Sequence, residues 1–155
     1  MPLPSSDGGS ESGSDDGNPP MLSSLPEWDG TAPVPPPAGD GRAAAIALTP
    51  WDADALGLLR AVLAADERSP RALSLTEAII LQVNAAEYSA WEHRWRCVVA
   101  LGADLSAEAA LTARVAGESP KNYQLWNYRA KLALARGPDH AEEARTQEEG
   151  ARDSE

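Results

Sequence analysis

The middle of the chain repeats apolar residues three and four positions apart, which is the spacing of one face of an α-helix. Three of these blocks open on Ser or Thr followed by Pro, where the first residue caps a helix and the second suits its first turn. No stretch alternates with the period of two that a half-buried strand requires. The pattern predicts an all-α protein with helices at about 50–67, 70–84, 86–101, 105–116 and 120–136.

The two ends of the chain differ from this helical repeat domain at 50–138. Residues 1–26 are mostly Ser, Gly, Asp and Pro, with too few apolar side chains to offset the entropy of ordering, and are predicted to be disordered. Residues 27–49 are predicted to form an extended Pro-rich strap, in which Trp28 docks on the helices. Residues 139–155 are an acidic tail, expected to be a short helix or disordered because their apolar face is only alanine.

The helical block contains an internal repeat. Four residue types recur 35 positions later, in the pairs Tyr88/Tyr123, Trp91/Trp126, Arg94/Arg129 and Gly102/Gly137. The unit is therefore predicted to be a helical hairpin of about 35 residues, stacked on its neighbours.

Three aromatic side chains and a valine form a stripe on the third predicted helix, made by Tyr88, Trp91, Trp95 and Val98. Such stripes in stacked hairpins are expected to be buried against a neighbouring helix. Arg94 and Arg129 follow each repeat Trp by one turn. Each guanidinium is expected to stack on the indole or to bond carbonyls of an adjoining hairpin.

The charge distribution argues against several classes of protein. The 155-residue chain has a net charge of −11, and the acids gather at its two ends, so it lacks the basic stripe of a nucleic-acid or anionic-membrane binder. No apolar run approaches the ~18 residues of a membrane span, and the N-terminus lacks a signal-peptide pattern, so a cytoplasmic protein is expected. The single Cys97 is expected to be a buried small side chain, and two distant histidines do not predict a metal site.

Two motifs carry a family resemblance, whereas the tetratricopeptide spacing is absent. They are Asn84-x-x-x-Tyr88-x-x-Trp91-x-x-Arg94 and Pro120-Lys121-Asn122-Tyr123-Gln124-Leu125-Trp126-x-x-Arg129. Both resemble the repeats of protein prenyltransferase alpha subunits. The run from Asp66 to Leu73, and upstream Glu27-Trp28 with Pro33-Val34-Pro35 and Asp40-Gly41, are similar to the alpha subunit shared by farnesyltransferase and geranylgeranyltransferase type I.

This resemblance, from about Glu27 to Arg136, implies a crescent of paired helices wrapped around a beta subunit in a heterodimer. The implied reaction transfers farnesyl or geranylgeranyl from its diphosphate to a cysteine near the C-terminus of a CaaX protein substrate. It also implies Zn²⁺ in the beta subunit and Mg²⁺ with the diphosphate, and no cofactor bound by this chain alone.

The resemblance also assigns roles to residues. It implies that Lys121 and Tyr123 are catalytic and contact the diphosphate from the first turn of the fifth helix, where the helix dipole adds positive charge. Asn122 and Gln124 are expected to shape the turn between repeats. Tyr88, Trp91, Arg94, Trp126 and Arg129 are expected to be structural repeat residues.

The sequence also departs from the family pattern. One arginine of each expected pair is missing, after Trp91 and again after Trp126. Family chains continue through further repeats, so this sequence is expected to be a fragment, a truncated product or an incomplete gene model. The alternative hypothesis is a truncated helical-repeat interaction module without an enzymatic role, which a polar face over the edge of the array would favour.

Overall fold

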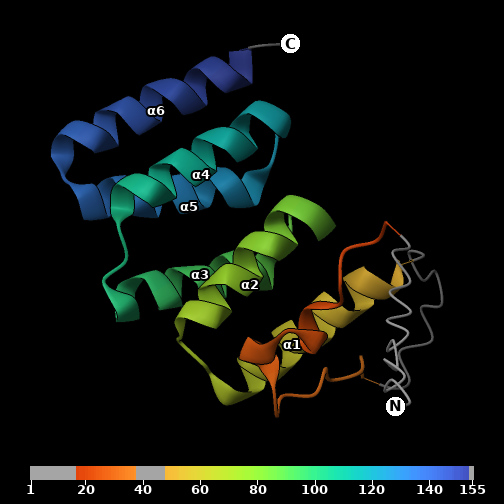
Figure 1. Cartoon of the computed structure of the whole chain (residues 1–155). Helices are drawn as coiled ribbons and strands as arrows, with labels where there is room; N and C mark the ends of the chain where they lie inside the picture. Colours follow the sequence, from red (N-terminus) through yellow and green to blue (C-terminus); the bar gives the residue numbers. More distant parts are fainter. Residues whose placement is uncertain (1–16, 38–47, 154–155) are drawn as a thin grey trace, which may run out of the picture.

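The computed structural model describes residues 17–37 and 48–153, and it confirms the all-α fold, with no strand in those two ranges. The six α-helices are α1 Pro50–Ala65, α2 Pro70–Ala78, α3 Tyr88–Leu101, α4 Leu105–Glu118, α5 Tyr123–Arg136 and α6 Pro138–Asp153 (Figure 1). Three short helical segments complete the fold, namely η1 Leu22–Ser24, η2 Pro26–Trp28 and the π-helical η3 Ile79–Val83, which continues α2. Predictions for residues 1–16, 38–47 and 154–155 lie outside the described residues.

The helices stack as antiparallel pairs. α2 pairs with α3, α4 pairs with α5, and α6 packs on α5 at the far end of the array from α1 (Figure 1). α3 and α5 also lie side by side, because the rings of Trp91 and Tyr128 approach to 4.9 Å between centroids. The two hairpins are therefore the two copies of the repeat predicted from the sequence.

The Pro-rich strap lies along α1. The backbone N–H of Val34 donates to the carbonyl of Gly57 at 3.0 Å, and Arg60 Nε donates to the carbonyl of Val34 at 2.6 Å. A Cβ atom at Gly57 would lie 2.7 Å from the Cβ of Pro33, so only glycine permits this approach of strap and helix. The strap is thereby fixed to the middle of α1.

Trp28 docks as the sequence predicted. Its side chain is only 2% exposed and belongs to the core formed with α1 and α2. The guanidinium of Arg71 lies 4.4 Å from the centre of the indole ring, and its Nη1 donates to the carbonyl of Glu27 at 2.8 Å. A cation stacked on an indole adds electrostatic attraction to the apolar burial.

The structure corrects the predicted limit of disorder at the N-terminal end. Disorder was expected through residue 26, but Leu22–Ser24 form the short helix η1. The backbone N–H of Ser23 donates to Asp54 Oδ2 at 3.0 Å, and this bond satisfies groups that would otherwise need water. The segment is ordered because a carboxylate in the first turns of α1 holds it.

The fifth helix begins later than predicted. It starts at Tyr123 and not at Pro120, because the Asn122 side chain accepts the backbone N–H of Leu125 at 3.3 Å and so acts as the cap. Ser119 instead ends α4, with its backbone N–H bonded to the carbonyl of Val115 at 2.8 Å. α4 also continues through Gly117, which was predicted to stop it.

The acidic tail forms a longer helix than predicted. α6 has 16 residues, and its half-buried positions include Ala141, Ala144 and Ala151, which lie along one face. Its remaining surface is charged and carries pairs one turn apart, such as Arg152 with Glu148. The small side chains of α6 thus pack against α5, while most of its charged residues are exposed to solvent.

The aromatic stripe on α3 is buried except at its start. Trp91 and Val98 are 3% and 2% exposed and Trp95 is half-buried, whereas Tyr88 is 55% exposed. The prediction that Tyr88 is buried is therefore wrong. Tyr88 is the first residue of α3 and lies about 60° around the helix from Trp91, on its exposed side.

Glu67 holds the turn between α1 and α2. Its carboxylate accepts hydrogen bonds from Arg71 Nε at 2.8 Å and from the Ser69 hydroxyl at 2.7 Å. The hydrogen bond from Arg71 holds the pKa of the Glu67 carboxyl below its usual range, despite the opposing effect of partial burial. A group with a lowered folded pKa stabilises the fold above its unfolded pKa and loses that effect as pH falls through the folded pKa.

We expect Glu67→Gln to lower the free energy of unfolding by about 1 kcal/mol at pH 7 and to have little effect at about pH 2. Urea unfolding at the two pH values measures the difference. Glu77→Gln, at an exposed glutamate of α2, is the matched control and should change little at either pH. A penalty for Glu67→Gln that is equal at both pH values would contradict the charge-assisted bond.

Candidate functional site

Lys121 and Tyr123 flank the turn that leads into α5. Between them, Asn122 is only 9% exposed, and its Nδ2 donates to the carbonyl of Ala85 in the turn before α3 at 2.5 Å. Because Asn122 points inward and binds both hairpins, its two neighbours point outward. Tyr123 is 80% exposed and Lys121 is also exposed.

A hydrogen bond that recurs in both repeats also holds this turn. The indole Nε1 of Trp126 donates to the carbonyl of Pro120 at 2.7 Å, and that of Trp91 donates to the carbonyl of Ala85 at 2.8 Å. Both bonds reach six residues back, so each repeat Trp fixes the turn before its own helix. Lys121 therefore lies between two fixed residues, which limits the positions that its ammonium can reach.

The structure brings Lys121 and Tyr123 together in one groove of about 260 Å³. Pro120 and Trp126 complete one wall, and α6 supplies the other, which consists of Glu148, Ala151 and Arg152. We call this the Lys121 groove. An ammonium and a phenol line it close to the start of α5, beside the paired Arg152 and Glu148, and such donors suit an anion with several oxygen atoms.

The prediction that Lys121 lies in the first turn of the fifth helix is wrong, because α5 begins two residues later. Tyr123 is its first helical residue. The partial positive charge of the helix start still lies beside both side chains.

A buried ion pair joins the two hairpins. Arg94 Nε and Nη2 donate to the two carboxylate oxygens of Glu108 at 2.9 and 2.7 Å, and both side chains are about 95% buried. The Tyr128 hydroxyl donates to the same carboxylate at 2.7 Å, and Arg94 Nη1 donates to the carbonyl of Leu73 at 2.9 Å. Burial, with the charge of Glu108, strongly raises the pKa of Tyr128, which keeps its proton.

Glu108 was missed by sequence reasoning, although a signal existed. It lies on the same face of α4 as the buried Leu111 and Val115, three and seven positions later. A carboxylate within an apolar face indicates a buried cation elsewhere, because an unpaired buried charge is strongly disfavoured. The prediction that Arg94 bonds carbonyls of an adjoining hairpin is wrong, because the carbonyl that it bonds lies on α2 of its own hairpin and the adjoining hairpin supplies the Glu108 carboxylate.

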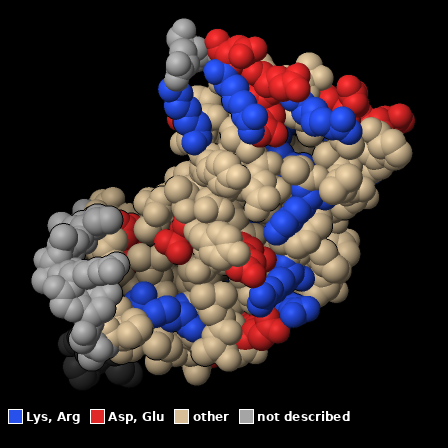
Figure 2. Space-filling view, turned by 180° about the vertical axis from the view of Figure 1, so that it is seen from behind, with Lys and Arg blue, Asp and Glu red and all other residues tan. Residues whose placement is uncertain are grey.

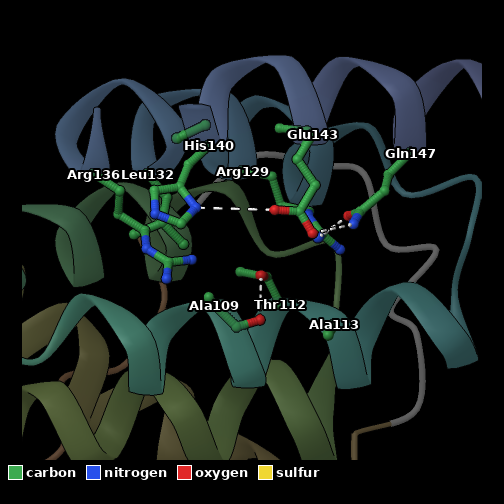
Figure 3. Close-up of a pocket in the computed structure, with 11 residues that line it drawn as sticks. Ala109, Thr112, Ala113, Arg129, Leu132, Arg136, His140, Glu143 and Gln147 are labelled. Atoms are coloured by element: carbon green, nitrogen blue, oxygen red, sulfur yellow. Dashed lines mark hydrogen bonds and ion pairs between the residues drawn. The ribbon is translucent and has the colours of Figure 1, made fainter. Parts of the chain in front are cut away.

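The equivalent two residues one repeat later bond other partners. Arg129 and Glu143 occupy the positions equivalent to Arg94 and Glu108, but they line a cavity of about 230 Å³ between α4, α5 and α6 (Figure 3). The Arg129 guanidinium stacks 5.4 Å from the Trp126 ring and donates to Gln147, while Glu143 faces His140 (Figure 3). Partial burial lowers the pKa of Arg129.

The remaining candidate groups are structural. Cys97 is fully buried, and burial raises the pKa of its thiol. The buried His93 places Nε2 at 2.6 Å from the carbonyl of Glu67. Within 17–37 and 48–153, no three His, Cys, Asp or Glu side chains are placed to hold a metal ion. None of the described helices is both long and apolar enough to cross a membrane.

Comparisons with known proteins identify the repeat. The family model of the protein prenyltransferase alpha subunit repeat matches residues 105–135, a range that includes Lys121 and Tyr123. The alpha subunit of protein farnesyltransferase/geranylgeranyltransferase type-1 from Solanum lycopersicum is 41% identical over 96 residues, which cover 62% of this chain and 28% of that protein. The same subunit from Arabidopsis thaliana is 38% identical over 120 residues, covering 77% of this chain and 36% of that protein.

A solved structure agrees with these relatives. Candida albicans protein geranylgeranyltransferase-I complexed with GGPP superposes with a TM-score of 0.60 at 30% identity, covering 68% of this chain and 35% of that chain. This chain thus spans about a third of the length of the relatives that it matches. The repeat match, the similar alpha subunits and the shared fold together show that the chain contains a protein prenyltransferase alpha subunit repeat and is similar to about a third of the length of the alpha subunits described above.

Proposed function

We propose that this chain acts as the alpha subunit of a heterodimeric protein prenyltransferase, in which it packs on a beta subunit and contacts the prenyl diphosphate. The reaction would transfer farnesyl or geranylgeranyl to a cysteine of a CaaX protein substrate. The observation that carries the proposal is the Lys121 groove, where the buried Asn122 holds Lys121 and Tyr123 outward beside the start of α5.

The chemistry explains why these side chains suit a diphosphate. The cysteine sulfur forms a bond to the first carbon of the prenyl chain as the carbon–oxygen bond breaks, and the electron pair leaves with the diphosphate. Negative charge on the diphosphate therefore grows during the step. The Lys121 ammonium and the Tyr123 hydroxyl would donate hydrogen bonds to its oxygens, and donors fixed before the reaction lower the barrier without reorganising.

The metals belong to the other components of this proposal. Zinc on the beta subunit would lower the pKa of the substrate cysteine so that its thiolate is the nucleophile, and magnesium would accompany the diphosphate. In the described part of this chain, no three His, Cys, Asp or Glu side chains are grouped to hold a metal ion. Its own contribution is to position cationic and hydrogen-bonding groups.

The relatives support the same assignment. The two described above are named as alpha subunits shared by the farnesyl and geranylgeranyl enzymes, and the solved relative is named as a complex with GGPP. A diphosphate carries several oxygens that the ammonium and the phenol of the Lys121 groove would bind.

One observation favours the alternative, an interaction module without an enzymatic role. α6 packs its alanines on α5 and presents a charged outer face, so it covers the edge of the second hairpin with polar surface. Such capping is typical of the end of a repeat array.

Co-expression with a panel of farnesyltransferase and geranylgeranyltransferase type I beta subunits separates the two functions. The proposal expects a one-to-one complex by size exclusion, and transfer of a labelled prenyl group to a CaaX peptide only when both chains are present. Failure to form any complex, or a complex no more active than the beta subunit alone, would favour the interaction module.

A further inference from the structure

The cavity between α4, α5 and α6 is lined by three basic side chains. Arg129 and Arg136 reach it from α5 and His140 from α6, while α4 forms the opposite wall with small uncharged residues (Figure 3). We call it the Arg136 cavity. It has no lining residue in common with the Lys121 groove, so the two are separate sites.

The internal repeat shows that two of these basic residues replace apolar ones. Arg136 and His140 lie 35 positions after Leu101 and Leu105. The equivalent place in the first repeat therefore carries two leucines, and the second repeat has gained a guanidinium and an imidazole there. The repeat architecture does not require these groups, because the first repeat folds without them.

The first repeat also balances its own charge. Arg94 donates to both oxygens of Glu108, to the carbonyl of Leu73 and to the Thr76 hydroxyl at 3.2 Å. One arginine thus faces one carboxylate, and its donors are used within the chain. In the Arg136 cavity two arginines face one glutamate, which leaves one positive charge even when the histidine is neutral.

The arginines of the cavity lack such acceptors. Arg129 donates to Gln147, which is uncharged. The half-buried Arg136 has no hydrogen bond or ion pair from its guanidinium within residues 17–37 and 48–153. Glu143 bonds neither arginine in those ranges; its side chain is 66% exposed and lies 3.9 Å from His140. The cavity therefore presents more donors than acceptors.

Other arginines nearby have acids beside them. Acids and bases crowd together along the edge that α6 forms (Figure 2). Arg145 lies 3.8 Å from Glu142, and Arg152 pairs with Glu148. The surplus of positive charge is thus a property of the Arg136 cavity and not of α6 as a whole, although the chain has a net charge of −11.

We propose that the Arg136 cavity binds a phosphate group. Guanidiniums form charge-assisted, often paired hydrogen bonds with phosphate oxygens. A tetrahedral dianion can meet the two arginines of α5 and the imidazole of α6 from different sides, whereas a flat carboxylate has only two oxygens to share among them. One water occupies about 30 Å³ in the liquid, so a cavity of about 230 Å³ has room for the five heavy atoms of a phosphate.

The remaining lining suits a small ligand. Apart from the polar groups, the walls are formed by alanines and Leu132, so a short carbon chain attached to the phosphate would meet apolar surface. A bound phosphate would link α5 to α6, which otherwise pack through small side chains. Ligands that bind only the folded state raise its stability, so phosphate should also raise the melting temperature.

The test titrates inorganic phosphate into the ¹⁵N-labelled full chain at constant ionic strength and follows backbone amide signals by NMR. Arg136→Leu installs the residue found at the equivalent position of the first repeat, and Arg136→Gln removes the charge without adding an apolar side chain. Arg114→Gln removes an arginine whose side chain is 64% exposed on α4 and is the matched control. Circular dichroism confirms that each variant is as helical as the parent.

We expect saturable shifts at Ala133 and Ala144, which line the cavity. Both Arg136 variants should weaken phosphate binding by at least about tenfold, as expected for the loss of a charge-assisted hydrogen bond, and Arg114→Gln should not. Shifts that do not saturate, or equal affinity in the parent and both Arg136 variants, would overturn the proposal. Such a result would mean that Glu143 and solvent satisfy the two arginines.

Two further titrations define the ligand. Glycerol phosphate distinguishes a small phosphate monoester from the free ion, and the source that binds more tightly is the ligand that the cavity selects. Sodium acetate tests the chemical class, because a carboxylate that binds as tightly as phosphate would show that the cavity does not select phosphate, and the proposal would be wrong.

The Lys121→Ala variant separates this site from the proposed function. Phosphate in the Lys121 groove would shift Asn122 and Tyr123, and Lys121→Ala should remove those shifts while those at Ala133 and Ala144 remain. If Lys121→Ala abolishes every shift, the Arg136 cavity binds no phosphate and only the groove does. If the cavity binds phosphate but the assembled chains transfer no prenyl group, the cavity proposal stands and the enzymatic role is wrong.

Discussion

Replacing Lys121 by alanine is expected to lower the turnover of the assembled heterodimer by ~10²–10³-fold, which is typical for the loss of one preorganised donor to a developing negative charge. The yield of heterodimer should not change, because the side chain is exposed and the turn is held by Asn122 and Trp126. Surface substitutions of this kind change stability by within about 0.5 kcal/mol. Single-turnover prenyl transfer to a CaaX peptide measures the chemical step directly.

Lys131, the other lysine of the chain, provides the matched control. It is exposed on α5, whereas Lys121 lies in the turn before that helix, so Lys131→Ala removes the same charge away from the Lys121 groove. We expect this variant to keep the parent turnover once assembled. Parent turnover in the Lys121→Ala heterodimer would show that no diphosphate contact is made, and the interaction module would then become the better account of the chain.

The helical fold was predictable because its signals are local. Caps such as Thr49 and Ser69 lie next to the apolar blocks that they start, and both accept hydrogen bonds at the helix starts predicted from the sequence. The turn before α5 was not predictable from such signals, because Ser119-Pro120 and Asn122 are both good starts. The choice depends on the carbonyl of Ala85, which belongs to the preceding hairpin and bonds Asn122.

The burial of individual aromatic residues could not be predicted from the sequence pattern either. Tyr88 and Trp91 are both apolar and three positions apart, but one is 55% and the other 3% exposed. A helical spacing shows that residues share a face and does not say whether the chain itself or a partner covers it. The groove shared by Tyr123 and Arg152 was likewise not predictable, because it depends on how α6 folds back on α5.

Glu108→Ala is expected to have the largest effect on stability. The substitution leaves the Arg94 guanidinium buried without its carboxylate, and breaking a buried pair in this way typically costs about 3–5 kcal/mol. It also removes the acceptor of the Tyr128 hydroxyl, so α3, α4 and α5 lose a shared contact. Urea unfolding followed by circular dichroism measures the loss.

Two further variants separate the lost pair from the lost side chain. Glu118→Ala removes an exposed acid from the same helix, whose contact with Arg114 spans 3.9 Å, and should cost less than about 1 kcal/mol. Arg94→Met combined with Glu108→Leu removes both charges while keeping similar volume, and should recover much of the stability lost in Glu108→Ala. If the double variant is as unstable as Glu108→Ala, the penalty comes from packing and from the bonds of Arg94 to α2, and the unpaired charge is not its cause.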